Sequence, residues 1–265
     1  MSSKQAKRRR PGQPQSRGRS RPDAARREAS PRVLIAAVVI VLLLIAGVVA
    51  AVKLTGGSSG SSPSSTASVD LPGAGDVQRL LKGIPQTGNV LGEPSAPVTM
   101  VEYVDLQCPY CQQFETQVMP NVIERFVRTG KLKVELRILA FIGPDSQRGQ
   151  AAAIAAAKQG REFNFVQLLY GNQAGENSGW LSDEMVTSAA NSIPGLDTQQ
   201  LLSDAGASGI KTTAQQYVTQ ATADKVSGTP TLLVGHTGST LSKVSLQSPT
   251  DEQSLADAIN AAAGG

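Results

Sequence analysis

The sequence has few cysteine and histidine residues that could bind a metal ion or form disulfide bonds. Its 265 residues include two cysteines, Cys108 and Cys111, and a single histidine, His236. A zinc site built from cysteine and histidine usually needs four such side chains, so one chain cannot complete it. A purely structural disulfide would close so short a loop that it would constrain little of the unfolded chain. The two cysteines therefore favour redox chemistry, and we expect neither a metal nor any cofactor beyond a redox-active Cys108–Cys111 disulfide.

The surroundings of the C-P-Y-C motif at 108–111 predict different roles for its two cysteines. Residues 98–104 (VTMVEYV) predict a buried strand, and residues 109–126 predict a helix. Cys108 then lies where the helix begins, and the free N–H groups and the helix dipole stabilise a thiolate there. Cys111 lies one turn further along, on the packed side. We therefore predict that Cys108 is the attacking thiol and Cys111 the resolving thiol.

Acidic and large apolar residues are scarce at the start of the chain. Residues 4–32 carry eleven Lys or Arg against two acidic residues, which predicts a disordered basic arm over 1–32. Residues 33–52 carry no charge and are long enough to cross a hydrocarbon layer of about 30 Å as a helix. Because basic residues stay on the cytoplasmic side, we expect a single-pass anchor in the cell membrane. Its N-terminus would be cytoplasmic and the rest of the protein would be outside.

Two other interpretations of this region stay open. Residues 33–52 could be a cleaved signal peptide, although the apolar run is longer than usual. The basic arm could contact nucleic-acid phosphates, but topology and contact with anionic lipids explain it more simply, so we expect no nucleic-acid partner. Residues 53–75, rich in Gly and Ser, predict a flexible linker. From residue 54 onward there are thirteen basic and nineteen acidic residues, so the basicity of the chain belongs to its N-terminal region.

Residues 76–265 have the length of one domain and alternate strand and helix signals without internal repeats. Strands are expected at 88–91, 98–104, 133–139, 231–234 and 241–246. Helices are expected at 109–126, 146–169, 181–190, 198–204, 211–222 and 251–262. Pro120 should kink the first of these helices. The pattern predicts an α/β domain in which a helical insertion at about 146–222 separates a strand-helix-strand half from a hairpin and a final helix.

Three features together resemble the thioredoxin superfamily, and specifically its DsbA-like branch, over about residues 90–263. They are the C-P-Y-C motif after a strand, the sequence GTPT at 228–231 before a late strand, and Glu102 six residues before the first cysteine. The resemblance implies a thioredoxin-like α/β fold with a helical insertion and thiol:disulfide oxidoreductase activity. Tyr110 departs from the branch, which typically has histidine there. A neutral ring cannot add an imidazolium charge beside the thiolate, so we expect a milder oxidant.

The resemblance also implies a substrate-binding set around the cysteines. Pro230 would follow a cis peptide bond and lie against the cysteine pair, and Thr229 would present its backbone to an extended substrate segment. A trans proline at the start of an edge strand is the alternative. Pro109 and Tyr110, which separate the two cysteines, complete the expected set.

Glu102 is the remaining candidate catalytic residue. A charged carboxylate on an apolar strand is costly to bury without a partner. Its functional interpretation is a buried carboxyl of raised pKa that accepts the proton of Cys111. The alternative is an edge-strand carboxylate that faces solvent or pairs with Arg137. Asp105 is more consistent with a turn residue, and His236 with a surface position in a hairpin turn.

We expect a membrane-anchored bacterial envelope protein that exchanges disulfides with secreted proteins. Disulfide formation is favoured, because a compartment outside the cytoplasm supports disulfides. Expected partners are unfolded or reduced secreted proteins and a membrane redox partner that recycles the cysteine pair. A disulfide isomerase or reductase of the same fold stays open, because direction depends on reduction potential and on the recycling partner. A tethered binding or scaffold domain without turnover is the alternative from another class.

Overall fold

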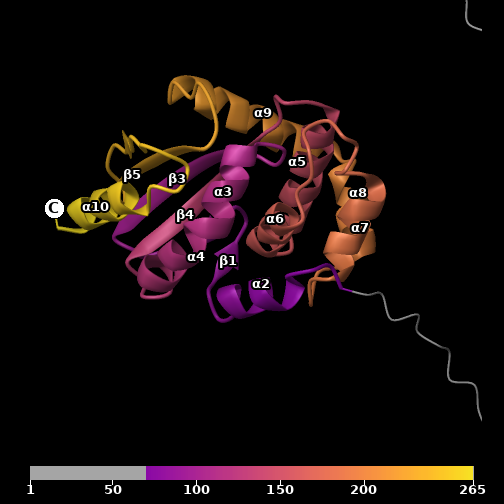
Figure 1. The fold of residues 1–265 in the computed structure, drawn as a ribbon, viewed down its shortest axis with the longest axis horizontal. Coiled ribbons are helices and arrows are strands. Elements are labelled where there is room, and N and C mark those ends of the chain that lie inside the picture. Colours follow the sequence, from indigo (N-terminus) through magenta and orange to yellow (C-terminus); the bar gives the residue numbers. More distant parts are fainter. Residues whose placement is uncertain (1–69, 265) are drawn as a thin grey trace, which may run out of the picture. The chain divides into compact units, whose positions relative to one another are not determined.

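A six-stranded mixed sheet organises the computed structural model, which describes residues 70–264 (Figure 1). Its strands are β1 (Gln86–Thr87), β2 (Val90–Leu91), β3 (Val98–Asp105), β4 (Leu132–Leu139), β5 (Thr231–His236) and β6 (Ser242–Lys243). The order in the sheet is β1-β2-β4-β3-β5-β6. β3 and β4 are parallel, and the other neighbouring pairs are antiparallel. The expected α/β thioredoxin-like arrangement is therefore present.

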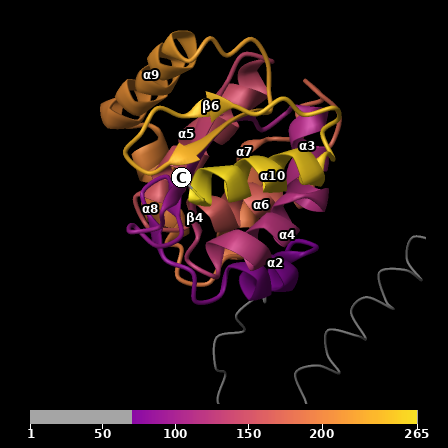
Figure 2. The same ribbon diagram turned by 90° about the vertical axis from the view of Figure 1, so that its left-hand side faces the viewer.

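Helices cover both faces of this sheet. They are α2 (Ala74–Leu81), α3 (Pro109–Gln117), α4 (Met119–Val122), the π-helical segment η1 (Ile123–Val127), α5 (Pro144–Ala157), α6 (Glu162–Gly171), α7 (Asp183–Asn191), α8 (Thr198–Ala205), α9 (Ser208–Ala223) and α10 (Glu252–Ala263). Figure 2 shows α9 on one side of the sheet and α3, α4 and α10 on the other. Glu252 of α10 accepts hydrogen bonds from Asn121 of α4 at 2.9 Å and from Arg125 of η1 at 2.6 Å, which ties these elements together.

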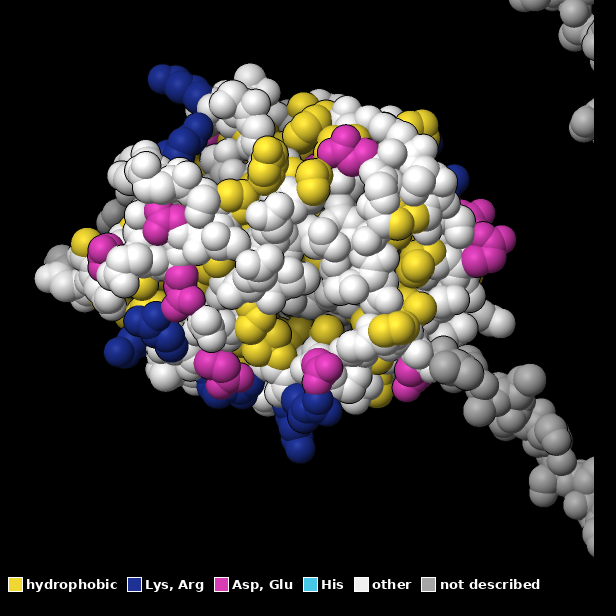
Figure 3. Space-filling view, in the orientation of Figure 1, with side chains coloured by type: hydrophobic (Ala, Val, Ile, Leu, Met, Phe, Trp, Pro, Cys, Tyr) yellow, Lys and Arg dark blue, Asp and Glu magenta, His cyan; other side chains and the backbone are white. Residues whose placement is uncertain are grey.

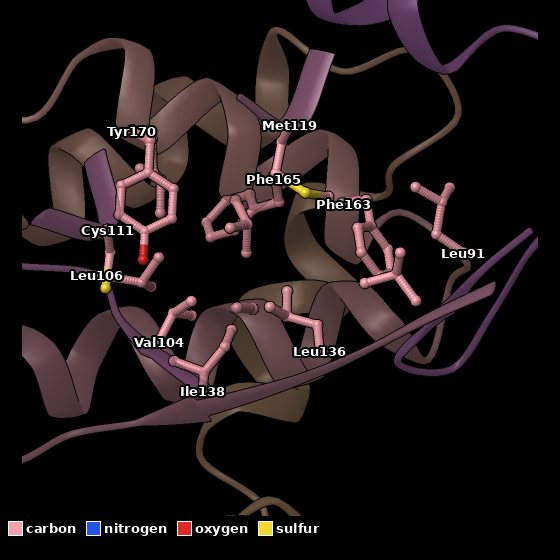
Figure 4. Close-up of a cluster of buried hydrophobic side chains, with 14 of the residues drawn as sticks. Leu91, Val104, Leu106, Cys111, Met119, Leu136, Ile138, Phe163, Phe165 and Tyr170 are labelled. Atoms are coloured by element: carbon pink, nitrogen blue, oxygen red, sulfur yellow. The ribbon is translucent and has the colours of Figure 1, made fainter. Parts of the chain in front are cut away.

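The core lies between the sheet and the helix that carries the cysteines. Every residue of β3 is buried, as expected for a strand that is covered on both faces. Figure 4 shows Val104, Leu136 and Ile138 directed toward the side chains of α3 and α6, with Cys111 at one end of the cluster. Burial of an aliphatic or aromatic side chain of this size stabilises the fold by roughly 1.5–3 kcal/mol. The end of α3 that holds the cysteines is therefore anchored in the hydrophobic core.

The helix expected over 109–126 is interrupted, as the proline predicted. α3 ends at Gln117, and Val118 separates it from α4. Pro120 lies in the first turn of α4, where its missing N–H removes no hydrogen bond of the new helix. The chain continues as the π-helical segment η1, which the sequence pattern did not indicate. Phe114, Val118, Val122 and Phe126 are all buried.

The single helix expected over 146–169 is wrong. The structure has two helices, α5 and α6, with a turn between Ala157 and Glu162. Gly160 lies in this turn with φ of 65°, the left-handed conformation that commonly ends a helix and that favours glycine. The strand expected over 241–246 is also too long, because β6 contains only Ser242 and Lys243.

Several predictions concern residues outside the described range. The basic arm at 1–32, the membrane segment at 33–52 and most of the linker at 53–75 lie there. Within residues 70–264, no helix is both long enough and apolar enough to span a membrane.

Candidate active site at the cysteine pair

Cys108 caps the N-terminus of α3. Its Sγ accepts a hydrogen bond from the backbone N–H of Cys111 at 3.4 Å, and Pro109 occupies the first turn. The N–H of Cys108 donates to the carbonyl of Asp105 at 2.9 Å, which joins the cap to the end of β3. Both cysteines are free thiols in this structure, with Cys108 at 6% and Cys111 at 0% relative exposure. The helix start thus holds Cys108 at the rim of the protein and Cys111 beneath it.

The two thiols have opposite acidities. The pKa of Cys108 is lowered from 9.0 to about 6, first by a hydrogen bond from the Cys111 thiol. Burial opposes this shift, while the Thr229 side chain and the backbone N–H groups of Cys111 and Tyr110 add to it. Burial raises the pKa of Cys111 well above its usual value, and the charge of the neighbouring Cys108 adds to this increase. The reduced pair therefore holds a thiolate at Cys108 and a thiol at Cys111 near neutral pH, which is consistent with the predicted roles.

The loop before β5 forms the opposite wall of the site. The Thr229–Pro230 peptide bond is cis, as the resemblance predicted. In its thiol form, Cys108 donates a hydrogen bond from Sγ to the Thr229 carbonyl oxygen at 3.3 Å. Segments 121 residues apart in sequence thus meet at the reactive sulfur.

A groove of about 260 Å³ opens beside this contact. The predicted residues Tyr110, Thr229 and Pro230 line it, together with Leu246, Ser248 and Pro249. Tyr110 is 57% exposed, so its ring is available to a bound molecule. The last three lining residues were not predicted, because 241–246 was interpreted as a strand whereas residues 244–249 form an irregular segment.

Glu102 is fully buried on β3, and the alternative interpretation of it as a solvent-facing or Arg137-paired carboxylate is wrong. It has 0% exposure and lies opposite Leu136 in the register, whereas Arg137 lies opposite Tyr103 on the other face of the sheet. Among the described residues, neither Glu102 carboxyl oxygen has a hydrogen-bond partner. Burial raises the pKa of Glu102 well above its usual value, and the nearby Glu115 carboxyl raises it further. Its catalytic role remains a prediction.

Glu115 was missed by the sequence analysis. It lies on α3 at 2% exposure, accepts a hydrogen bond from Gln167, and burial raises its pKa as well. Glu115 follows Cys111 by four residues, so both lie on one face of the helix, and this spacing could have indicated it. The buried Tyr170 lies near all of these groups, because Cys111, Glu115 and Glu102 each raise its pKa in addition to burial. Figure 4 shows its hydroxyl beside Cys111.

Asp105 has a larger part in the site than a turn residue would. Its Oδ1 accepts from the Gln107 N–H at 2.9 Å and from the Ser146 hydroxyl at 2.6 Å. Its Oδ2 accepts from the N–H groups of Phe141 and Ile142 at 3.0 and 3.2 Å. A single buried carboxylate therefore joins the turn before Cys108 to the loop after β4. His236, by contrast, is exposed at the end of β5, as expected.

No group of three or more His, Cys, Asp or Glu side chains within residues 70–264 is arranged to hold a metal ion. The site therefore consists of a cysteine pair in two protonation states, a loop that contacts the reactive sulfur, and a buried pair of carboxyl groups. This arrangement can carry out thiol–disulfide exchange, because the thiolate is the nucleophile and the leaving group of that reaction.

Comparisons with known proteins agree with this chemistry. The thioredoxin family model matches residues 85–257. A probable disulfide bond formation protein D of Bacillus cereus is 30% identical over 151 residues, which cover 56% of this chain and 70% of the relative. The crystal structure of oxidised BdbD from Bacillus subtilis shares the fold, with a TM-score of 0.59 and 20% identity over 69% of this chain and 98% of that one.

A thioredoxin-like oxidoreductase from Silicibacter pomeroyi is also similar, with a TM-score of 0.54 and 26% identity over 72% of this chain and 98% of that one. The C-P-Y-C motif, the cis-proline loop and the shared fold thus all indicate the same family. This chain belongs to the thioredoxin family, as a DsbA-like thiol:disulfide oxidoreductase.

Proposed function

We propose that this protein forms disulfide bonds in secreted or envelope proteins outside the cytoplasm. The observation that carries the proposal is the environment of Cys108, which lowers its pKa to about 6. Stabilising this thiolate favours the reduced form of the cysteine pair. The oxidised pair is correspondingly more ready to take electrons from client thiols.

The reaction begins when a client thiolate attacks Sγ of Cys108 in the oxidised pair. A client–Cys108 disulfide forms, the bond between Cys108 and Cys111 breaks, and Cys111 leaves with the electron pair and takes up a proton. A second client thiolate then attacks the client sulfur, and Cys108 leaves as the stabilised thiolate. The client loses two electrons and the cysteine pair gains them.

The buried carboxyl pair supports the proton transfer at Cys111. Glu102 and Glu115 both have pKa values raised by burial, so this pair can hold a proton near neutral pH. In the direction of client oxidation it would supply the proton that Cys111 takes up. In the opposite direction it would accept the proton when Cys111 attacks a mixed disulfide.

The surface around the cysteines suits an unfolded client. The groove beside Cys108 combines the exposed Tyr110 ring with Leu246 and Pro249. Figure 3 shows that the centre of the face viewed there is largely uncharged and carries scattered hydrophobic groups, while Lys and Arg lie toward its edges. Apolar segments of an unfolded chain fit such a surface, and the Thr229 loop would contact the client backbone.

We propose that residues 33–52 anchor the protein in the cell membrane, with residues 1–32 in the cytoplasm and the catalytic domain outside. The reduced cysteine pair must then pass two electrons to an oxidant, which we propose is a membrane redox partner. A reporter that works only outside the cytoplasm should be active when fused after Gly75. Activity of a cytoplasmic reporter at this position would contradict the orientation, and a mature protein that begins after Lys53 would contradict the anchor.

The reduction potential of the full-length protein tests the direction of exchange. Equilibration with glutathione buffers near pH 7 should give a value between about −120 and −230 mV, the range from DsbA to glutaredoxins. A value at or below about −270 mV, that of thioredoxin, would indicate a reductase. Activity on a scrambled client with little activity on a reduced one would indicate an isomerase. The Cys108→Ser variant is the control, because it lacks the attacking thiol and cannot exchange.

A further inference from the structure

Three polar side chains form a cluster on the face of the sheet opposite the cysteine pair. The Tyr103 hydroxyl donates to Asp224 Oδ2 at 2.6 Å and accepts from an Arg137 N–H at 2.6 Å. Arg137 also lies 3.4 Å from Asp224, and its guanidinium lies 5.4 Å from the centre of the Tyr103 ring. Tyr103 is fully buried, and Arg137 and Asp224 are largely shielded, with side-chain exposures of 16% and 33%. Hydrogen bonds between charged and shielded partners of this kind are among the stronger ones.

This cluster lies at both ends of the cis-proline loop, residues 225–230. Asp224 is the C-terminal cap of α9, so the loop begins directly after it. Thr231 follows the loop and pairs with Tyr103 in the β3–β5 register. Tyr103 therefore lies at both ends of the loop: its hydroxyl contacts Asp224, and its position in β3 is opposite Thr231.

The middle of the same loop contacts the reactive sulfur. When Cys108 is protonated, its Sγ donates to the Thr229 carbonyl at 3.3 Å. The Thr229 side chain instead lowers the Cys108 pKa, so it is the group of this loop that stabilises the thiolate. The loop has other contacts as well: Val226 packs against the core, and the Thr231 hydroxyl donates to the Gly228 carbonyl at 2.7 Å. Lys243 donates to the Lys225 carbonyl at 3.0 Å, and the Val226 N–H donates to the Ala221 carbonyl at 2.8 Å.

We propose that Tyr103, Arg137 and Asp224 are positioning residues that hold the cis-proline loop at the distance from which Thr229 contacts Cys108. They do not touch the reacting sulfur atoms. They act through the loop, from the opposite face of the sheet, and so set the reactivity of Cys108 in thiol–disulfide exchange. The inference rests on Cys108 being the reactive thiol and does not depend on whether exchange runs toward oxidation.

Two variants weaken the cluster with little change in volume. Tyr103→Phe removes only the shared hydroxyl, and Asp224→Asn removes the carboxylate charge at a partly exposed helix end. Glu135→Gln is the matched control, because Glu135 is the other carboxylate that pairs with Arg137, at 3.2 Å, and it lies outside the contact with the loop. The measurement is the alkylation rate of Cys108 as a function of pH in the reduced full-length protein, which needs no client.

Tyr103→Phe and Asp224→Asn should each move the profile toward higher pH. A threefold slower reaction on its acidic limb corresponds to about half a pKa unit. Glu135→Gln should leave the profile where it is in the wild type. In a Thr229→Val background, Tyr103→Phe should have a smaller effect, because the Thr229 hydroxyl is already missing.

Three results would overturn the proposal. The first is an unchanged pH profile of Cys108 alkylation in both cluster variants. If thermal stability falls while the profile stays unchanged, the cluster has only a structural role. The second is a shift in Glu135→Gln as large as that in Asp224→Asn. The third is a full effect of Tyr103→Phe in the Thr229→Val background, because the effect would then not pass through the loop.

Discussion

The pH dependence of the reduction potential should reveal the unequal acidities of the two cysteines. The pKa of Cys108 is about 6, while that of Cys111 is raised well above its usual value of 9.0. Between these values the reduced protein carries one thiolate and one thiol, so reduction of the disulfide takes up two electrons and one proton. The potential should then fall by about 30 mV per pH unit. Below the pKa of Cys108 two protons are taken up, and the slope should be about 59 mV per pH unit.

The expected size of the effect follows from the same pKa shift. Lowering the pKa of Cys108 from 9.0 to about 6 means that the fold stabilises its thiolate. This stabilisation of the reduced form is complete above pH 9 and is lost as the pH falls through 6. Three pKa units correspond to about 4 kcal/mol, or about 90 mV for a two-electron couple. At about pH 7, one pH unit above the Cys108 pKa, only about one of these three units contributes. The reduction potential should therefore be at most about 30 mV higher than that of a pair in which the Cys108 pKa is 9.0. Solvent screening at the groove reduces this figure.

The assay is equilibration of the full-length protein with glutathione buffers over a range of pH, followed by alkylation and mass analysis. Cys111→Ala provides a companion test, because the Cys111 thiol is the largest influence that lowers the Cys108 pKa. In this variant the midpoint of Cys108 alkylation should move to higher pH. A single slope of about 59 mV per pH unit up to about pH 8.5, or an unchanged alkylation midpoint in Cys111→Ala, would refute the assignment.

The remaining predictions concern the roles of individual residues. Cys111→Ser should accumulate mixed disulfides with client proteins on non-reducing gels and Cys108→Ser should not. Equal trapping by both variants would contradict the assignment, and trapping by Cys108→Ser alone would reverse it. Glu102→Gln should slow resolution of the mixed disulfide on the order of a hundredfold and change its pH profile, as expected for loss of a general base. Glu115→Gln should have a smaller effect in the same single-turnover assay, and wild-type rates in both variants would make the carboxyl pair structural. Tyr110→His should raise the reduction potential by about 30 mV for each pKa unit by which the Cys108 thiolate is stabilised, and an unchanged or lower potential would show that the ring position does not act on the thiolate.

Much of the fold could be predicted because its signals are local. The apolar run of β3, the alternation of β4 and the motif between them indicated a strand-helix-strand unit, and each element is present within a few residues. The errors lie where a pattern continues but the backbone turns. The alanine-rich pattern continues past the end of α5, so it did not predict the turn that contains the left-handed Gly160. The alternating residues at 241–246 predicted a strand, but most of this segment is irregular.

At the site, the sequence alone was sufficient to identify the reactive cysteine pair. The spacing of Cys108 and Cys111 and the start of a helix at Cys108 are properties of adjacent residues, and they predict which thiol is exposed and which is shielded. The contacts that set the reactivity of these thiols required the tertiary structure. Thr229 reaches Cys108 across 121 residues, and Tyr103 reaches Asp224 across the same separation. The face on which Glu102 lies followed from the register of β3 with β4, which brings Leu136 rather than Arg137 opposite it. Local periodicity determines which residues share a face of an element, whereas packing between distant segments determines which groups meet, and the acidity of a thiol depends on the groups that it meets.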